Sequence, residues 1–314
     1  MHVQTGAKTR FFLITSLIAL SPYAHAGSQS PAQAPDFWTI WGDGKAEVAG
    51  YTLKVNRYGE ERSGQAVTIF VTETFEHKRH VKIDRKTDGL QYPVMKLNLI
   101  RDFQTGIYDY NTMISVFVSL EDSPELSRGS PSKISFSSQE WCGHVYHHLR
   151  FEKNQAHETI HSYFDSEADQ TRTIPIPPEA ITEDSLWHWA RGLSGPRLKR
   201  GQTLSRPLLP SLFRARLAHR AISPTRVTLS RSPKPYTMRS QGASVEVEAF
   251  TATIDGGPTW KFEVSTKSPH QILQWSNDRG ESATLRGAKR IAYWKLNGPG
   301  GQGALKELGI LPLP

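Results

Sequence analysis

Runs in which apolar and polar residues alternate recur along this chain and limit its fold more than any other feature. Such runs occupy residues 51–56, 67–71, 95–99, 114–120, 245–250 and 260–264. Because a period of two residues places successive side chains on opposite faces of a strand, each run predicts a β-strand. Short turns containing glycine separate several of the runs and favour antiparallel neighbours. We therefore expect a mainly β fold: curved antiparallel sheets, or a half-open barrel or sandwich, with a short helical connector.

The first 26 residues have the pattern of a signal peptide. Lys8 and Arg10 precede an apolar run of ten residues at 11–20. That run is too short to span a bilayer, and the sequence AHA at 24–26 fits a cleavage site. We therefore predict export to the periplasm. No later apolar run approaches the roughly 18 residues of a spanning helix, so we expect no integral membrane span after cleavage.

Composition divides the chain into five segments. In order they are a signal peptide at residues 1–26, a disordered polar lead-in at 27–35, an N-terminal antiparallel β block at 36–175, a basic helical connector at 176–239 and a C-terminal β block at 240–314. In the connector, Thr182 fits the N-cap of one helix and Pro210 the first turn of another. The pattern leaves open whether the two β blocks share one sheet or form two domains.

Positive charge is concentrated in the connector. The whole chain carries a net charge of +8, yet the segment from Ser185 to Val245 contains twelve Lys and Arg and no Asp or Glu, so the rest sums to −4. Such a block produces a local positive potential. We predict that it binds anionic envelope components, with Arg214, Arg216 and Arg220 as ligand-binding candidates. Scattered, solvated arginines are the alternative, and export disfavours nucleic acid as a partner.

Five of the twelve histidines and the only cysteine lie within residues 141–165. The sequence HETIH at 157–161 fits the H-E-x-x-H motif of zinc proteases. On a helix this spacing brings both imidazoles to one ion, whereas on a strand it separates them by roughly 13 Å. The neighbouring residues predict two strands joined by a turn at Lys153 and Asn154, which disfavours the zinc-protease interpretation.

The two-residue turn predicts the register of this hairpin. It pairs Arg150 with His157, His148 with Thr159, Tyr146 with His161, His144 with Tyr163 and Cys142 with Asp165. All these side chains then share one polar face, and a slip of one residue would break the match. His147 lies on the opposite, apolar face, where we expect a core residue with a hydrogen-bond partner.

The polar face of the hairpin supplies the remaining candidate site residues. The ligand-binding candidates are Tyr146, His148, His161 and Tyr163, and the catalytic candidates are Cys142, His144 and Asp165. The favoured interpretation is a face that binds a ligand by stacking and hydrogen bonds, without a metal or another cofactor. The alternatives are a metal site at His144, His148 and His161, or a nucleophile pair of Cys142 and His144.

Several blocks resemble exported bacterial proteins of unknown function. They are PVMKLNLIRDFQTGIYDYN at 93–111, KISFSSQEWCGHVYHHL at 133–149, HSYFDSEAD at 161–169 and the later runs TWKFEV and IAYWKLN. The resemblance covers most of the mature chain. It implies an antiparallel β architecture with a concave sheet able to hold an apolar or amphipathic ligand, and no established activity.

Some proteins of this group carry the label "septum formation inhibitor", which belongs to cytoplasmic nucleotide pyrophosphatases. Those enzymes have a serine-proline-arginine phosphate loop at the N-terminus. The nearest match here is LSRSPK at 229–234, in the middle of a β-rich chain. We therefore do not carry the pyrophosphatase activity over.

Three functional hypotheses follow. The favoured one is an exported periplasmic β-rich protein, without enzymatic activity, that binds an amphipathic small molecule or an anionic envelope component. The second is an exported metal-dependent or Cys/His hydrolase that uses Cys142, His144, His148, His161 and Asp165. The third is a structural partner in an envelope complex. The sequence leaves the oligomeric state open.

Overall fold

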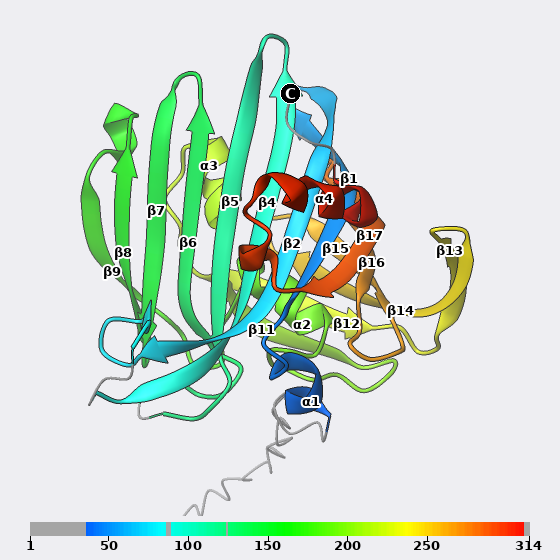
Figure 1. The fold of residues 1–314 in the computed structure, drawn as a ribbon. Coiled ribbons are helices and arrows are strands. Elements are labelled where there is room, and N and C mark those ends of the chain that lie inside the picture. The colour runs from blue at the N-terminus through cyan, green and yellow to red at the C-terminus, as the bar shows by residue number, and fades with distance from the viewer. Residues whose placement is uncertain (1–35, 86–88, 124, 311–314) are drawn as a thin grey trace, which may run out of the picture.

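The computed structural model describes residues 36–85, 89–123 and 125–310. The predicted signal peptide and lead-in, residues 1–35, lie outside the described residues. The strands form one large curved sheet that does not close on itself (Figure 1), which confirms the predicted mainly β, half-open architecture. Within the described ranges, no helix is both long enough and apolar enough to cross a membrane.

The N-terminal block begins with a short helix and continues as a series of hairpins. Its elements are α1 (Phe37–Trp41), β1 (Ala46–Arg57), β2 (Glu60–Glu76), β3 (Val81–Lys82), β4 (Gln91–Thr105), β5 (Tyr108–Ser119), β6 (Pro131–Glu140), β7 (Gly143–Glu152), β8 (Gln155–Ser162), the 3-10 helix η2 (Asp165–Glu167) and β9 (Gln170–Pro175). The turns β1–β2, β4–β5 and β6–β7 and the connection β8–β9 lie at one end of the sheet (Figure 1). We call this end the rim.

The connector contains both predicted helices and also strands that the sequence did not indicate. Its elements are β10 (Ile181–Thr182), the 3-10 helix η3 (Glu183–Ser185), α2 (Leu186–Ala190), β11 (Thr203–Leu209), α3 (Leu212–Ala218), β12 (Thr225–Arg231) and β13 (Tyr236–Ser240). Thr182 caps η3 by accepting a hydrogen bond from the Ser185 N–H. Ser211 is the N-cap of α3, so Pro210 lies just before the helix and not in its first turn.

The C-terminal block adds four strands and a terminal helical segment. Its elements are β14 (Ala243–Ile254), β15 (Thr259–Ser265), β16 (Ile272–Asn277), β17 (Ser282–Ile291), the 3-10 helices η4 (Tyr293–Lys295) and η5 (Pro299–Gln302), and α4 (Gly303–Leu308).

Strand pairing shows that the two β blocks form a single sheet. The order is β9-β8-β7-β6-β5-β4-β2-β1-β17-β16-β15-β14-β12-β11-β10. Among the strands of the described ranges, only β10 and β11 pair in parallel. The junction of the blocks is the pairing of β1 with β17, where Ala46 lies opposite Ile291. β3 extends the end of β2, and β13 pairs with the first half of β14.

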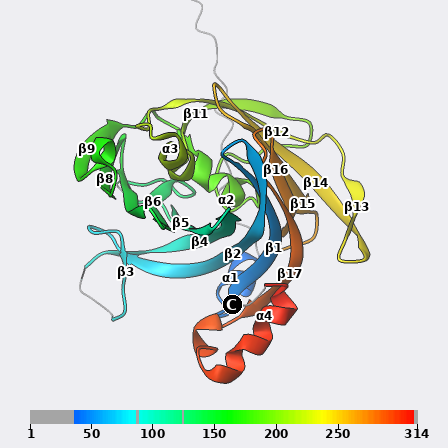
Figure 2. The same cartoon turned by 90° about the horizontal axis from the view of Figure 1, so that it is seen from above.

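The connector helices lie inside the curve of the sheet, as the view from above shows (Figure 2). Every residue of α2 is buried. The Trp187 ring meets the rings of Trp260, Phe262 and Trp275 edge-on, at centroid distances of 5.2 to 5.7 Å. The concave face around α2 is therefore packed with the protein's own side chains.

Buried ion pairs tie the inside of the curve together. The Arg191 guanidinium binds both carboxylate oxygens of Glu47, with Nη1–Oε1 and Nη2–Oε2 distances of 2.6 and 2.9 Å. Arg101 of β4 binds Glu281 beside β17 at 2.9 Å. Because an unpaired charge in such a place is costly, each pair fixes the two elements that carry it.

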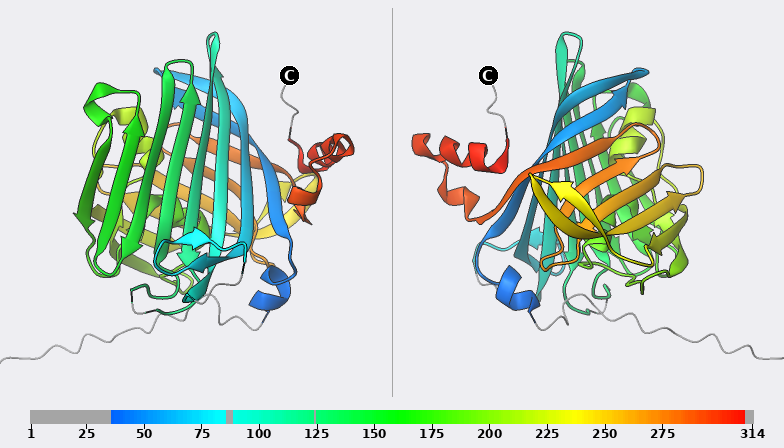
Figure 3. Two further views of the ribbon diagram at one scale, coloured as in Figure 1. Left: turned by 60° about the vertical axis from the view of Figure 1, so that its left-hand side comes forward. Right: turned by 90° about the vertical axis from the view of Figure 1, so that its right-hand side faces the viewer.

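The C-terminal segment packs on the outside of the sheet, away from the connector (Figure 3). There Leu308 joins a small apolar cluster with residues of β1 and β2, namely Ala46, Val48, Val67, Ile69 and Val71. Gly50 and Gly287 lie opposite each other in the β1–β17 pair. A Cβ at Gly50 would lie 2.3 Å from the Leu308 carbonyl oxygen, and one at Gly287 would lie 2.4 Å from that of Glu307. The two glycines allow this close backbone approach.

Substituting Gly287→Ala should therefore loosen the C-terminal segment. We expect a loss of about 1–3 kcal/mol in the free energy of unfolding, the usual range for overpacking, and faster proteolysis after residue 291. Gly298→Ala is the matched control, since a Cβ there would meet no atom within 4 Å. Equal stability and equal proteolysis of the two variants would contradict the packing role of Gly287.

The buried carboxyl of Asp184 predicts a pH dependence of stability. Its Oδ2 accepts a hydrogen bond from the Leu212 N–H at 3.0 Å, and burial raises its pKa to about 6. The folded state then binds the proton more tightly than the unfolded state does, so the carboxyl favours folding at low pH and opposes it as the pH rises through 6.

Asp184→Asn should accordingly raise the free energy of unfolding at pH 8 by up to about 3 kcal/mol, and by much less at pH 4.5. The amide oxygen can still accept the bond from Leu212. Urea unfolding at the two pH values measures the difference, and an equal effect at both would show that ionisation of Asp184 does not govern stability.

Candidate functional site

The histidine-rich segment forms the hairpin that its sequence predicts. In β7 and β8, Arg150 pairs with His157, His148 with Thr159 and Tyr146 with His161. The Tyr163 N–H donates to the His144 carbonyl oxygen at 3.1 Å, which continues the register beyond the last ladder pair. The polar side chains lie on the outer, convex face of the sheet, while Val145, Leu149 and Phe151 are buried on the inner face.

The H-E-x-x-H sequence is split between the two faces of β8. His157 and His161 lie on the outer face, and Glu158 is buried on the inner face. Glu158 Oε1 binds His147 Nε2 at 2.8 Å, and Glu158 also pairs with Arg172. Burial acts to raise the pKa of Glu158, but the bonds to His147 and Arg172 outweigh it and lower the pKa. His147 is thus the partnered core residue that its position predicted.

One predicted pair is not formed. Cys142 and Asp165 do not face each other, because β7 begins only at Gly143 and β8 ends at Ser162. Gly143, the first residue of β7, has a φ of 149° and pairs with Glu140 of β6. Cys142 is exposed in the β6–β7 turn, and Asp165 begins η2. Among the described residues, no three His, Cys, Asp or Glu side chains are grouped closely enough to hold a metal ion.

The outer face of this hairpin borders an open groove of about 450 Å³. We call it the outer groove, and its polar and aromatic lining consists of Asn111, Ser137, Ser138, Gln139, His144, Tyr146, His161, Ser162 and Asp169. Of the predicted ligand-binding residues, Tyr146 and His161 line it. His148 lies one row further along β7, where burial lowers its pKa.

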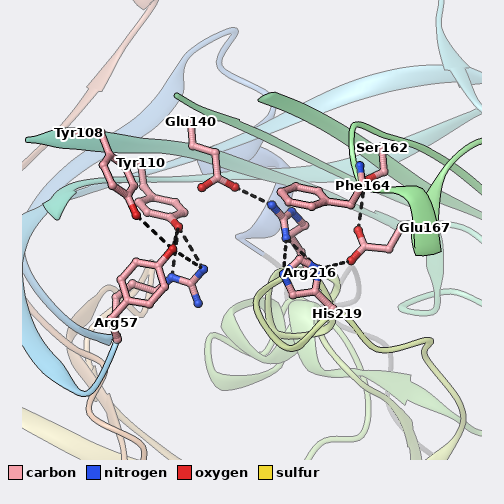
Figure 4. Close-up of polar contacts among 10 residues, drawn as sticks. Arg57, Tyr108, Tyr110, Glu140, Ser162, Phe164, Glu167, Arg216 and His219 are labelled. Carbon is pink, nitrogen blue, oxygen red and sulfur yellow. Dashed lines mark hydrogen bonds and ion pairs between the residues drawn. The ribbon is translucent and has the colours of Figure 1, made fainter. Parts of the chain in front are cut away.

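At the rim, tyrosines from two turns meet on the inner side of the sheet (Figure 4). The hydroxyl of Tyr58 lies 2.9 Å from that of Tyr110 and accepts a hydrogen bond from Tyr108 at 3.1 Å. Arg57 donates to the Tyr110 hydroxyl at 3.0 Å. The bonds from Tyr108 and Tyr110 lower the pKa of Tyr58, whereas burial raises that of Tyr110. The sequence showed no sign of this cluster.

Arg216, a predicted anion-binding residue, faces the inside of the protein. Figure 4 shows its guanidinium between the sheet and His219. Its Nη2 lies 2.5 Å from Glu140 Oε1, and its guanidinium lies 4.1 Å from the centre of the Phe164 ring. His219 in turn binds Glu167 at 2.6 Å. Arg216 therefore attaches α3 to the rim ends of β6 and β8.

The connector cations differ in whether they form ion pairs. Arg191, Arg200, Arg206, Arg214, Arg216 and Arg231 form ion pairs with acids that lie outside the acid-free window. Arg214 pairs with the buried Glu183, which also accepts a hydrogen bond from the Trp260 indole. Arg220 is exposed just beyond α3. Half of the twelve cations in the positive block thus pair with glutamates elsewhere in the chain.

Part of the positive block surrounds a cavity of about 260 Å³. We call it the arginine pocket, and its main lining residues are Trp189, Arg191, Arg197, Arg200, Arg231, Glu248, Phe250, Val264 and His270. One carboxylate oxygen of Glu248 accepts a hydrogen bond from Arg200 Nε at 2.5 Å, and the other accepts one from Arg231 Nε at 2.8 Å. Desolvation and the charge of Arg231 lower the pKa of Arg197. The charge run indicated this region, but the sequence did not indicate which arginines converge.

Comparison with known proteins does not identify the family of this chain. No family model matches the chain, and no curated protein matches it. A solved structure that resembles it is a beta-barrel-like protein of a domain of unknown function, DUF1849, from Brucella abortus. The two share 9% sequence identity with a TM-score of 0.45, over 78% of this chain and 98% of the other.

The Arg216–Glu140 pair yields a stability prediction. Glu140→Gln leaves a buried guanidinium without its carboxylate, so we expect a loss of about 3–5 kcal/mol in the free energy of unfolding. Glu61→Gln is the control, because the Lys54–Glu61 pair is more than half exposed on both sides, and such a pair contributes at most about 1 kcal/mol. Chemical denaturation measures both.

The double variant Glu140→Gln with Arg216→Met tests the cause. Removing both charges should recover much of the stability that Glu140→Gln loses. Additive losses in the double variant would mean that the two side chains act independently. That result would contradict the role of the Arg216–Glu140 ion pair described above.

Proposed function

We propose that this chain is an exported, non-enzymatic protein that binds an amphipathic anion of the cell envelope in the arginine pocket. The observation that carries the proposal is the combination of charges and apolar walls around one cavity. Arg200 and Arg231 supply two positive charges and share the single negative charge of Glu248, and Arg197 lines the same cavity. The fourth arginine of the lining, Arg191, is already balanced by Glu47. The pocket thus keeps an excess of positive charge.

The apolar part of the pocket supports a ligand with a nonpolar portion. Trp189 and Phe250 meet edge-on with a centroid distance of 5.6 Å, and Val264 adds to the wall. Arg231 lies over the Phe250 ring at 5.4 Å, so cation and ring form one surface. Aromatic walls with a few charged groups that fix orientation are typical of small-molecule sites.

The ligand class follows from the chemistry of the guanidinium group. Arginine binds carboxylate and phosphate through two parallel hydrogen bonds and remains charged at neutral pH. A cavity of about 260 Å³ fits an anionic head and the first part of an apolar chain, with the remainder outside. Four residues of the predicted basic block line this cavity, namely Arg191, Arg197, Arg200 and Arg231. Arg214 and Arg216, by contrast, are engaged in ion pairs inside the protein.

Binding of octyl phosphate tests the proposal. The double variant Arg197→Ala with Arg200→Ala should bind it at least about tenfold more weakly than the unaltered protein, the loss expected when charge-assisted hydrogen bonds are removed. Added salt should weaken binding to the unaltered protein. Isothermal titration calorimetry measures both effects.

Two controls isolate the pocket. Arg239→Ala removes an exposed arginine of β13 that donates only to the nearby Gly242 carbonyl oxygen, and it should leave the affinity unchanged. Octyl glucoside, which has the same chain without the charge, should bind far more weakly than octyl phosphate. Equal affinity of the double variant and the unaltered protein would refute the pocket as the binding site.

A further inference from the structure

The outer groove is built from side chains that lie in register across four strands. In one row, Asn111 of β5 lies opposite Gln139 of β6, which lies opposite His144 of β7. In the next row, Ser137 lies opposite Tyr146, which lies opposite His161 of β8. Directly opposed side chains on one face are about 5 Å apart. The groove thus presents a continuous array of amides, hydroxyls and rings.

The array is close to electrically neutral. Within the described part of the chain, no lysine or arginine lines the groove. Its one carboxylate, Asp169, accepts a hydrogen bond from His161 Nδ1 at 2.9 Å. At the end of the first row, Asp102 binds the Asn111 amide at 2.6 Å, and burial together with Asp109 raises the pKa of Asp102 to about 6. The groove therefore offers both donors and acceptors and favours neither anions nor cations.

Exposed aromatic rings lie beside these polar groups. Tyr146 is 41% exposed within the groove, and Tyr163, which follows β8 beside His144, is 68% exposed. Tyr163 packs against Gly143, where a Cβ would lie 2.6 Å from its ring. Rings held on a rigid sheet with one face in water are amphipathic platforms. They suit a ligand that is itself apolar on one face and rich in hydroxyls at its edges.

We infer that the outer groove binds a neutral, polyhydroxylated chain, namely a short stretch of glycan. Sugar hydroxyls both donate and accept, which matches Asn111, Gln139 and Ser137, and the flat apolar faces of sugar rings match Tyr146. An added peptide strand is a poorer occupant, because the groove lies on the face of strands whose backbones are already paired on both sides. This site is separate from the arginine pocket and does not depend on the function proposed for it.

Titration with neutral oligosaccharides tests the inference. The probes are tetra-N-acetylchitotetraose, cellotetraose and maltotetraose at millimolar concentration, and calorimetry measures their binding. At least one probe should bind, and Tyr146→Ala should weaken its binding at least tenfold. Tyr146→Trp keeps a ring for stacking and should retain most of the affinity. Gln139→Ala should cause a smaller loss.

Matched controls separate this site from other surfaces. Tyr236→Ala removes a similarly exposed tyrosine, 38% accessible on β13, and should leave glycan binding unchanged. The Arg197→Ala, Arg200→Ala double variant should also bind the glycan normally, even if it loses octyl phosphate. Failure of all three probes to bind, or equal binding by Tyr146→Ala and the unaltered protein, would overturn the inference.

Discussion

The structure depends on ion pairs that join the connector to the curved sheet. Arg191 binds Glu47 at the start of β1, and Arg216 binds Glu140 at the end of β6. Both pairs are almost fully buried, so neither partner can be removed without leaving an uncompensated charge. Together with the indole cluster around Trp187, they hold α2 and α3 inside the curve. A sheet whose interior is filled in this way stays open instead of closing into a barrel.

These pairs explain a feature of the sequence that suggested something else. The acid-free window predicted a positive surface. The glutamates that pair with two of its arginines, however, lie far away in the sequence: Glu47 is 144 residues from Arg191, and Glu140 is 76 residues from Arg216. Local charge density carries no information about such pairing, because tertiary structure alone decides which cations are neutralised. Arg220 and Arg239 stay exposed, and Arg200 and Arg231 share a single glutamate beside the arginine pocket, so these arginines keep the character that the sequence predicted.

The hairpin was predictable because residues close together in the sequence determine its register. A two-residue turn and the alternation of side chains determine the register from Arg150 to His161, and the structure has that register. The prediction of the Cys142–Asp165 pair was wrong because the β7–β8 ladder ends at the pair of Val145 and Ser162. The remainder of the outer groove could not be predicted. Asn111 and Gln139 face each other only through the β5–β6 register, and a long loop between these strands separates them in the sequence.

The pairing of β1 with β17 also affects how the chain can fold. The strand at residues 46–57 has its second neighbour at residues 282–291, so one side of β1 remains open until nearly the whole chain has been made. The apolar residues on the outer face of β1 likewise stay uncovered until α4 has been made. Contacts of such long sequence separation form slowly, and the strand edges stay exposed until they have formed. The central seam therefore cannot close before residues 282–291 have been made, and a holding factor that shields β1 during that interval would raise the yield of folded protein.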